Sequence, residues 1–220
     1  YNRRMYVHLN RATKYIKDGY KTLLLNKIKD KYSIFENIPI LYIAAGPSLD
    51  ENIEWIKENQ NKFFIVAIGA IYKKLLDYNI CINIIITFDE QEFLNDIQFD
   101  DESVSKIGKD TIILASTITN NKILKKLSHK NLFLYEVFSS IYKNNLSVSG
   151  FSIGELVLDI LIKLNSKNVY LIGLDFSLNQ KTGDSHSSDS SSGITKLDLM
   201  MEQDREYFNS RESLIKVKGN

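Results

Sequence analysis

The stretch ILYIAAGPSLDENIEWI, Ile40–Ile56, runs from a short apolar segment through a Gly-Pro turn into a helical pattern. Its first residues, Ile40–Ala44, are apolar without alternation, which is typical of a strand buried on both faces. Five further apolar runs predict strands, namely Phe63–Ile68, Ile82–Phe88, Thr111–Ala115, Leu132–Val137 and Val169–Leu174. Because helical patterns separate several of these runs, we expect an α/β fold with a doubly wound, mostly parallel sheet and helices on both faces.

The N-terminal segment has a different pattern. Apolar residues recur at roughly helical spacing among lysines and arginines over residues 3–31, which predicts one long amphipathic helix or two. We therefore expect residues 1–36 to form an amphipathic helical segment that packs on an α/β domain of residues 37–220. Within that domain, helices are predicted over 49–59, 70–78, 120–128, 152–165 and 196–210. Because the sequence starts at Tyr1 and no signal peptide follows, we interpret it as a piece of a longer protein.

Composition limits the classes of partner. The 220 residues are 44% hydrophobic, enough to bury a full core. With 28 basic and 27 acidic residues, the net charge of +1 gives no general attraction to nucleic acid or to an anionic membrane. No apolar run reaches the length of a membrane span. The single cysteine, Cys81, lies in an apolar run and is expected to be buried, which fits a reducing, cytoplasmic location.

The turn after the first strand is the first candidate site, because open parallel sheets bind ligands beyond the carboxyl ends of their strands. It contains Gly46, Pro47 and Ser48. Ser48 with Glu51 matches a capping box, and Gly46 permits another group to approach closely. A helix start also attracts anions, although Asp50 and Glu51 oppose a phosphate there. The residues alone are consistent with a plain helix entry or with a ligand seat.

The turn SVSG, residues 147–150, is the second candidate. It precedes a strongly apolar helical pattern, in which Ser152 and Glu155 repeat the capping-box spacing. The hydroxyl of Ser149 and the bare backbone of Gly150 would suit a phosphate. A common glycine-serine turn with no ligand explains the same residues equally well.

Carboxylates follow two of the predicted strands. Asp175 follows the last strand, which we expect to be central in the sheet, and it either caps the next turn or faces the ligand crevice. Asp89 and Glu90 follow the third strand. Their spacing differs from the D-x-D pattern of two carboxylates that share a nucleotide-bound metal, so we expect no required metal ion.

His186 is the one histidine predicted to lie beyond the carboxyl edge of the sheet. It falls in the Ser-rich segment 181–193, which we expect to be too polar to pack and therefore mobile. A neutral imidazole could accept a proton from an attacking hydroxyl at neutral pH. The alternative is an ordinary solvated loop residue.

Taken in order, four motifs resemble the central DUF115 domain of the motility accessory factor family, which are bacterial flagellin glycosyltransferases. They are GPSL (46–49), SVSG (147–150), YLIGLDF (170–176) and GDSH (183–186). The same motifs show a more distant similarity to bacterial sialyltransferases, which implies a Rossmann-like, sialyltransferase-like fold. The resemblance covers residues 40–186.

This resemblance implies transfer of a nonulosonic acid, of the pseudaminic, legionaminic or sialic type, from a CMP-activated donor to Ser or Thr of flagellin. It implies no separate cofactor and no metal. Residue by residue, Gly46, Pro47 and Ser48 match the turn beside the nucleotide, and Ser149 and Gly150 match the turn that holds its phosphate.

The remaining matches complete the expected site. Asp175 and Phe176 match the end of the sugar-nucleotide strand, and His186 matches a loop histidine, so His186 and Asp175 are the expected catalytic residues. Gly69 and Asp89, which follow the second and third strands, are the other expected nucleotide contacts. The sialyltransferases have asparagine where this chain has Ala45 and Gly69, and tyrosine where it has Ser177. These departures favour the motility accessory factor family over the sialyltransferases.

Two other functions stay open. DUF115 relatives include pyrophosphokinases that act on a pterin, which implies ATP and Mg²⁺ held by Asp89, Glu90 and Asp175. The departures at Ala45 and Gly69 suggest, alternatively, a non-catalytic nucleotide-binding or flagellar assembly module.

Overall fold

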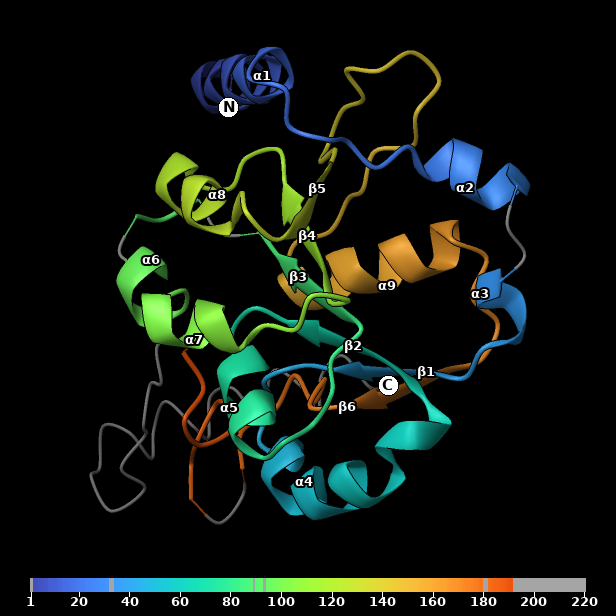
Figure 1. Cartoon of the computed structure of the whole chain (residues 1–220), viewed down its shortest axis with the longest axis vertical. Coiled ribbons are helices and arrows are strands. Elements are labelled where there is room, and N and C mark those ends of the chain that lie inside the picture. The colour runs from blue at the N-terminus through green and yellow to red at the C-terminus, as the bar shows by residue number, and fades with distance from the viewer. Residues whose placement is uncertain (1, 32–33, 89, 93, 180–181, 192–220) are drawn as a thin grey trace, which may run out of the picture.

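The computed structural model describes residues 2–31, 34–88, 90–92, 94–179 and 182–191 (Figure 1). The helix expected over 196–210 lies outside these residues. Six parallel strands form one sheet in the order β5-β4-β3-β2-β1-β6. The strands are β1 (Ile40–Ile43), β2 (Phe64–Ile68), β3 (Ile84–Thr87), β4 (Ile112–Ser116), β5 (Asn131–Tyr135) and β6 (Val169–Ile172). All six predicted strands and the doubly wound α/β class are thus confirmed.

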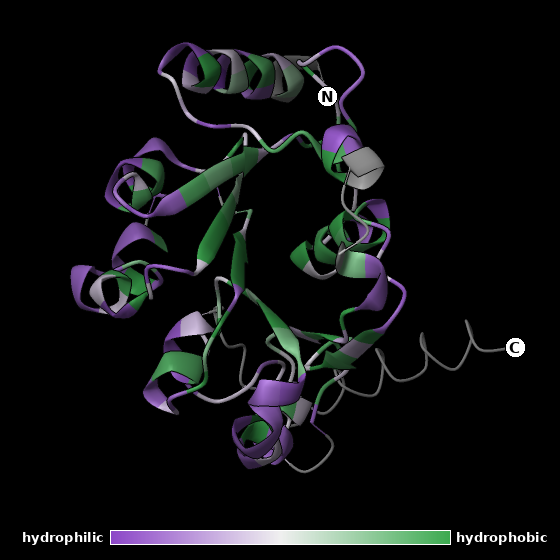
Figure 2. Cartoon of the chain, turned by 45° about the vertical axis from the view of Figure 1, so that its right-hand side comes forward, coloured by the Kyte–Doolittle hydropathy of each residue, from purple (hydrophilic) through white to green (hydrophobic). Residues whose placement is uncertain are grey.

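Helices cover both faces of this sheet (Figures 1 and 2). One face carries the helices that connect β1 through β5, namely α4 (Ser48–Asn59), α5 (Tyr72–Asp77), α6 (Leu94–Ile97), α7 (Asp101–Lys106) and α8 (Asn121–Leu127), with the short 3-10 helix η1 (Gln60–Lys62) after α4. The opposite face carries α2 (Leu25–Lys31), α3 (Ile34–Asn37) and α9 (Ile153–Lys163). The green strands between two helical layers in Figure 2 show that the apolar core is the sheet itself.

The N-terminal segment forms two main helices, as one of the two sequence-based alternatives predicted. Helix α1 (Asn2–Lys17) lies beside the β5 end of the sheet (Figure 1). Arg11 Nη1 donates to the carbonyl of Ile118 at 2.5 Å, and the buried Tyr15 hydroxyl donates to the carbonyl of Thr119 at 2.7 Å. After α1 the chain makes a parallel bridge to β5 at Thr22. The segment is therefore anchored on the α/β domain by backbone and side-chain contacts.

Three local predictions were wrong. Strand β6 is an edge strand rather than a central one, and Tyr170 and Leu171 are accordingly exposed. Cys81 is exposed, because its neighbours Ile80 and Ile82 take the two buried positions. Helices α6 and α7 were not predicted. Asp100 nevertheless marks the start of α7, since its carboxylate accepts from Ser103 N at 2.9 Å.

The order of the strands places the topological switch point between β1 and β6. The chain builds the sheet outward from β1 to β5, and α9 then carries it back to β6 on the other side of β1. Residues just after Ile43 and Ile172 therefore meet at the position where open α/β sheets bind ligands. No helix in the described part of the chain has the length and apolar character that a membrane crossing needs.

Candidate functional site

At the switch point, the GPSL turn after β1 is joined to the LDF segment after β6. The Asp175 carboxylate accepts from Ser48 twice, from the backbone N–H to Oδ2 at 2.8 Å and from the hydroxyl to Oδ1 at 2.5 Å. The Ser48 hydroxyl in turn accepts from Gly173 N at 3.1 Å. Of the two roles open to Asp175 in the sequence, the structure gives it the capping one, but for a helix distant in sequence.

This bridge corrects the expected capping box of the first turn. Helix α4 starts at Ser48 itself, with Pro47 in the N-cap position and no side-chain cap from within the turn, so the Ser48–Glu51 pair does not form the box. Asp175 supplies the acceptor that an N-cap side chain would otherwise supply. The positive end of the α4 dipole therefore already faces a carboxylate from this chain.

Gly46 is required for the same contact. A Cβ at this position would lie 2.5 Å from Asp175 Oδ2 and 2.6 Å from the Gly173 carbonyl oxygen. Gly46 N also donates to that carbonyl at 2.6 Å, and Gly173 adopts a left-handed φ of +73°. We expected Gly46 to make room for a ligand. The group that approaches it most closely is instead the chain's own Asp175–Gly173 segment.

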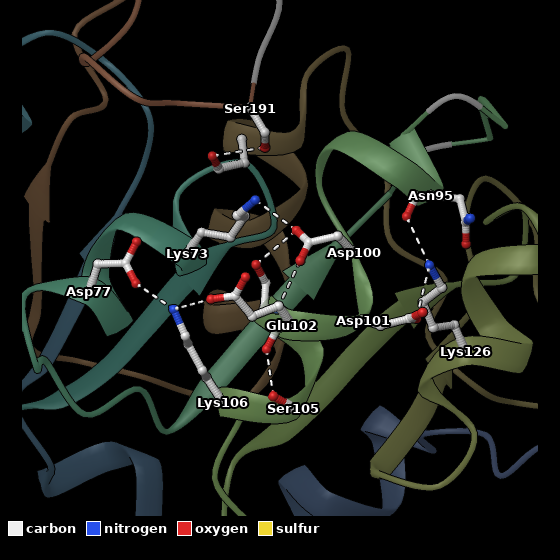
Figure 3. Close-up of polar contacts among 12 residues, drawn as sticks. Lys73, Asp77, Asn95, Asp100, Asp101, Glu102, Ser105, Lys106, Lys126 and Ser191 are labelled. Atoms are coloured by element: carbon white, nitrogen blue, oxygen red, sulfur yellow. Dashed lines mark hydrogen bonds and ion pairs between the residues drawn. The ribbon is translucent and has the colours of Figure 1, made fainter.

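Residues 182–191 of the Ser-rich segment pack across the carboxyl ends of β1 and β2, contrary to the expectation that the segment is too polar to pack. Ser187 is completely buried, and its N–H donates to the Ala45 carbonyl at 2.7 Å. Ser191 donates from both N–H and hydroxyl to the Ala70 carbonyl, at 2.9 and 3.0 Å (Figure 3). Polar residues pack here because polar groups of the sheet edge and of α4 and α5 accept and supply their hydrogen bonds.

An ion pair between a buried lysine and an exposed aspartate fixes this segment in place. Lys74 of α5 pairs with Asp50 of α4, and the Lys74 ammonium also donates to the Ser187 hydroxyl and to the carbonyl and hydroxyl of Ser188, at 2.9 to 3.0 Å. Asp50 further accepts from Ser187 Oγ at 2.5 Å and Ser188 N at 2.9 Å. Burial raises the pKa of Asp50, but the hydrogen bonds from Lys74, Ser187 and Ser188 outweigh it and keep the pKa below its usual value.

His186 precedes the buried Ser187 and is held by the same segment. Its Nδ1 lies 2.9 Å from the Ser185 hydroxyl. Partial burial lowers the pKa of His186 below 6.5, because desolvation disfavours the imidazolium. The imidazole is therefore neutral at pH 7, the state in which a histidine can accept a proton.

The SVSG turn lies at the start of α9, where the capping box predicted for Ser152 and Glu155 is confirmed. The amides of the turn are largely held by carboxylates of the helix. Ser149 N donates to Asp159 Oδ2 at 2.9 Å, and Phe151 N donates to Glu155 Oε2 at 2.6 Å. The side chain of Ser149 is exposed, so its hydroxyl faces solvent beside Gly150.

Exposed aromatic rings stand on the loops at this edge of the sheet. Phe176, directly after Asp175, is 68% exposed and adopts a left-handed φ of +49°. Its ring reaches the start of α9, since a Cβ on Gly154 would lie 3.7 Å from Phe176 Cζ. Phe151, next to Gly150, is also fully exposed. A left-handed backbone conformation costs free energy at an aromatic residue, so the rest of the fold must stabilise this conformation of Phe176.

The two other expected nucleotide contacts are Gly69 and Asp89. Gly69 donates its N–H to the Ile86 carbonyl at 2.8 Å and is covered by Gln98 and Phe99, so it is buried under the loop before α7. Asp89 lies outside the described residues. Within the described ranges, no three His, Cys, Asp or Glu side chains gather as a metal site would require.

Two buried charged residues of this edge were missed in the sequence. Lys74 lies in the helical pattern IYKKLLDY, where a lysine is normally exposed, and no local signal distinguishes it from Lys73. Glu136 follows β5 and accepts from Ile141 N and Asn145 Nδ2, both at 2.6 Å, which fixes the loop that leads to SVSG. The sequence feature that could have identified Glu136 is the one used for Asp175, namely a carboxylate shortly after a strand.

A polar hollow lies away from these residues. It has a volume of about 620 Å³ and lies between the end of α1 and α8, where Lys14, Tyr20 and Lys125 are among its lining residues. None of the residues expected to bind the nucleotide lines it.

Comparison with known proteins places the chain in a family. Residues 9–181 match the model of the family described as 6-hydroxymethylpterin diphosphokinase MptE-like. The chain belongs to this MptE-like family. Its fold is similar to that of the MAf glycosyltransferase from Magnetospirillum magneticum AMB-1, with a TM-score of 0.58 and 16% identity. No curated protein matches it.

The match to the glycosyltransferase covers 74% of this MptE-like chain but 26% of the solved one. The chain therefore spans about a quarter of that protein's length. At this identity the similarity concerns the fold. Together with the family match, it confirms the resemblance to the motility accessory factor group that the four motifs indicated.

Proposed function

We propose that this MptE-like chain is a glycosyltransferase domain that moves a nonulosonic acid, of the pseudaminic, legionaminic or sialic type, from a CMP-activated donor to Ser or Thr of flagellin. The observation that carries the proposal is the place of His186. A histidine that is neutral at pH 7 is held beside the topological switch point, in a fold shared with a MAf glycosyltransferase. A transfer to a hydroxyl needs a base at that place.

In the proposed reaction, the acceptor oxygen forms a bond to the anomeric carbon, and the bond from that carbon to the phosphate oxygen of CMP breaks. His186 takes the proton of the acceptor hydroxyl. When Nδ1–H donates to Ser185, the lone pair of Nε2 is available for this proton. No metal ion is required, because CMP leaves as a phosphate monoester whose charge the exposed hydroxyl of Ser149, beside Gly150, stabilises by hydrogen bonding.

The other residues have supporting roles in this proposal. Phe176 stacks on the cytosine ring, for which its exposed ring at the sheet edge is suited. Gly46, Pro47 and Ser48 form the wall of the nucleotide crevice. Asp175 keeps that wall in place through its two bonds to Ser48, so its contribution to catalysis is indirect.

The family description favours a second candidate, a pterin diphosphokinase that uses ATP and Mg²⁺. Its metal would need Asp89, Glu90 and Asp175 to converge. Asp175 is bound to Ser48, and Glu90 contacts His8 at 3.1 Å. These contacts would have to break for a metal to bind, which makes this candidate weaker than the transferase. A non-catalytic nucleotide-binding module is the third.

Calorimetric titration separates the transferase from the diphosphokinase, and activity assays separate both from the module. The transferase binds CMP in the presence of EDTA, the diphosphokinase binds ATP only with Mg²⁺, and the module catalyses neither reaction. Transfer from a CMP-linked nonulosonic acid to flagellin is then measured for the wild type and for His186→Gln. We expect the rate to fall by about 10²-fold or more. Undiminished transfer by His186→Gln would remove His186 from the mechanism, and failure to bind CMP would remove the transferase itself.

A further inference from the structure

Lys74 is a deeply buried charged group of the site. Its side chain is 4% exposed, whereas that of its partner Asp50 is 38% exposed. A buried ammonium is costly unless acceptors surround it. Four acceptors do so here, one from Asp50 and three from Ser187 and Ser188. All but one of these acceptors belong to the two residues that directly follow His186.

The Lys74 ammonium thereby joins three separate parts of the chain. Asp50 comes from the first turn of α4, Lys74 from α5, and the two serines from the segment 183–191. Backbone bonds to the carbonyls of Ala45 and Ala70 fix the same segment on the strand ends, and Lys74 lies under it. Removing the ammonium would leave a carboxylate and two serines without their common donor.

Lys74 also changes the electrostatics of the α4 turn. Asp50 and Glu51 place two negative charges in the first turn, which opposes an anionic ligand nearby. The ion pair neutralises Asp50 at the point closest to the segment that carries His186. The pair therefore reduces the repulsion that a nucleotide phosphate would meet beside this turn.

We infer that Lys74 is a positioning residue, which holds the segment 183–191 closed over the ends of β1 and β2 and thereby fixes His186 toward the donor site. This inference rests on the proposed function for its effect on catalysis. The closed segment itself is a property of the chain that is measurable without any substrate.

Lys73 provides a matched control. It is the preceding residue of the same helix, and its Nζ pairs with Asp100, the N-cap residue of α7, at 2.7 Å (Figure 3). The substitutions Lys74→Met and Lys73→Met each remove one ammonium from α5 and keep the length of the side chain. Lys74→Arg retains the charge and tests rescue.

The first readout is hydrogen exchange of residues 183–191 by mass spectrometry. In Lys74→Met we expect exchange of this segment to rise by about 10-fold or more, with α4 and the strands unchanged. Lys73→Met should leave the segment at the wild-type rate, and Lys74→Arg should restore most of the protection. Unchanged exchange in a folded Lys74→Met chain would overturn the inference.

The second readout is the titration of His186 by NMR, assigned by the resonance that His186→Gln loses. Its pKa should move from its lowered value up toward about 6.5 in Lys74→Met, because the ring becomes solvated. If Lys74→Met does not fold, Ser188→Ala removes one Lys74 acceptor with a smaller perturbation and should shift exchange and titration in the same direction. A pKa that does not move in either variant contradicts the inference.

Kinetics then separate this inference from the proposed function. We expect kcat for sugar transfer to fall by about 10²-fold in Lys74→Met, since the base is misplaced, and KM to rise by a smaller factor, since Asp50 is no longer neutralised beside the donor site. A wild-type chain without transfer activity would contradict the proposed function, but exchange and titration would still decide whether Lys74 closes the segment. A fall in kcat as large in Lys73→Met would contradict the specific role of Lys74.

Discussion

Asp175 caps a helix that begins 127 residues before it. Its two carboxylate oxygens accept from the N–H and the hydroxyl of Ser48, at 2.8 and 2.5 Å, and so join the strand-helix unit β1–α4 to the end of β6. The contact lies at the switch point of the sheet, where the proposed nucleotide crevice has its wall. The wall is therefore held by this carboxylate together with the backbone bonds of Gly173 to Gly46 and Ser48.

Removing that carboxylate should destabilise the chain. We expect Asp175→Ala to lower the free energy of unfolding by about 1–3 kcal/mol, because the N–H and hydroxyl of Ser48 lose their acceptor in a partly buried place. Urea denaturation followed by circular dichroism measures the change. Asp110→Asn, at an exposed position before β4, is the control and should be near neutral. Equal effects of the two substitutions would contradict the capping role.

The close packing at Gly46 gives a second prediction. A Cβ in Gly46→Ala would meet Asp175 Oδ2 at 2.5 Å and the Gly173 carbonyl at 2.6 Å, so we expect a loss of about 1–3 kcal/mol. Gly108→Ala, whose Cβ would lie 3.4 Å from Thr111 Oγ1, should change stability by less than about 0.5 kcal/mol. Combining Gly46→Ala with Asp175→Ala should be less than additive, since the first clash disappears while that with Gly173 remains. Full additivity would mean that the two residues do not interact.

Acid should lower the free energy of unfolding, because Asp50 and Asp100 become protonated. Asp100 has a pKa well below its usual value, chiefly because Lys73 and the Ser103 amide donate to it, and the pKa of Asp50 is also lowered. A carboxyl whose pKa is lower in the folded state stabilises the fold above its unfolded pKa of about 3.9, and this contribution is lost as the pH falls through the folded pKa. Urea midpoints measured from pH 7 to pH 2.5 should therefore decrease below about pH 4.5.

The variant Asp100→Asn tests the source of that decrease. It should be less stable than the wild type at pH 7, and its midpoint should change less between pH 4.5 and pH 2.5, because one of the two titrating groups is gone. A midpoint that falls as steeply in Asp100→Asn as in the wild type would show that other groups dominate.

The lowered pKa of His186 predicts the pH dependence of transfer. A base must be neutral, so kcat should be constant near pH 7–8 and fall only below the pKa, which lies under 6.5 because of burial. His186→Gln should lose this acidic limb along with most of the rate. His129→Gln, altered at a histidine in the turn before β5, should keep both. A limb that persists in His186→Gln would place the base elsewhere.

Phe176 gives a prediction for binding alone. We expect Phe176→Ala to weaken CMP binding by about 1–3 kcal/mol in calorimetry, because a stacked ring contributes about that much per base. Tyr170→Ala, at another exposed aromatic position, on β6, is the control and should bind CMP as the wild type does. Undiminished affinity in Phe176→Ala would exclude stacking at this ring.

The sequence predicted the sheet well because its strands are buried on both faces. The run Ile84–Thr87 is an example: its residues are apolar or β-branched, and all four are buried. Such a composition by itself predicts a strand in the interior of a sheet. The edge position of β6 could not be predicted in the same way, since half of an edge strand is still apolar. Its exposed Tyr170 and Leu171 look like core residues in the sequence.

The site was predicted less well because its contacts join distant residues. A capping box can be recognised within four consecutive residues, as at Ser152 and Glu155. The partner of Ser48, in contrast, is Asp175, which lies 127 residues later in the sequence. Burial of Lys74 likewise depends on a segment that follows it by more than a hundred residues. Composition described the Ser-rich segment correctly as polar. Composition could not show that the Lys74 ammonium and the carbonyls of Ala45 and Ala70 form hydrogen bonds with this segment.

The position of β6 has a consequence for the order of folding. During synthesis, β1 through β5 and the helices between them emerge first, while one side of β1 still lacks its neighbour and the start of α4 still lacks its acceptor. Until residue 175 has emerged, β1 presents an open, apolar edge to other chains. A nascent chain stalled before this point is thus the form most prone to aggregate, and the last strand both closes the sheet and completes the candidate site.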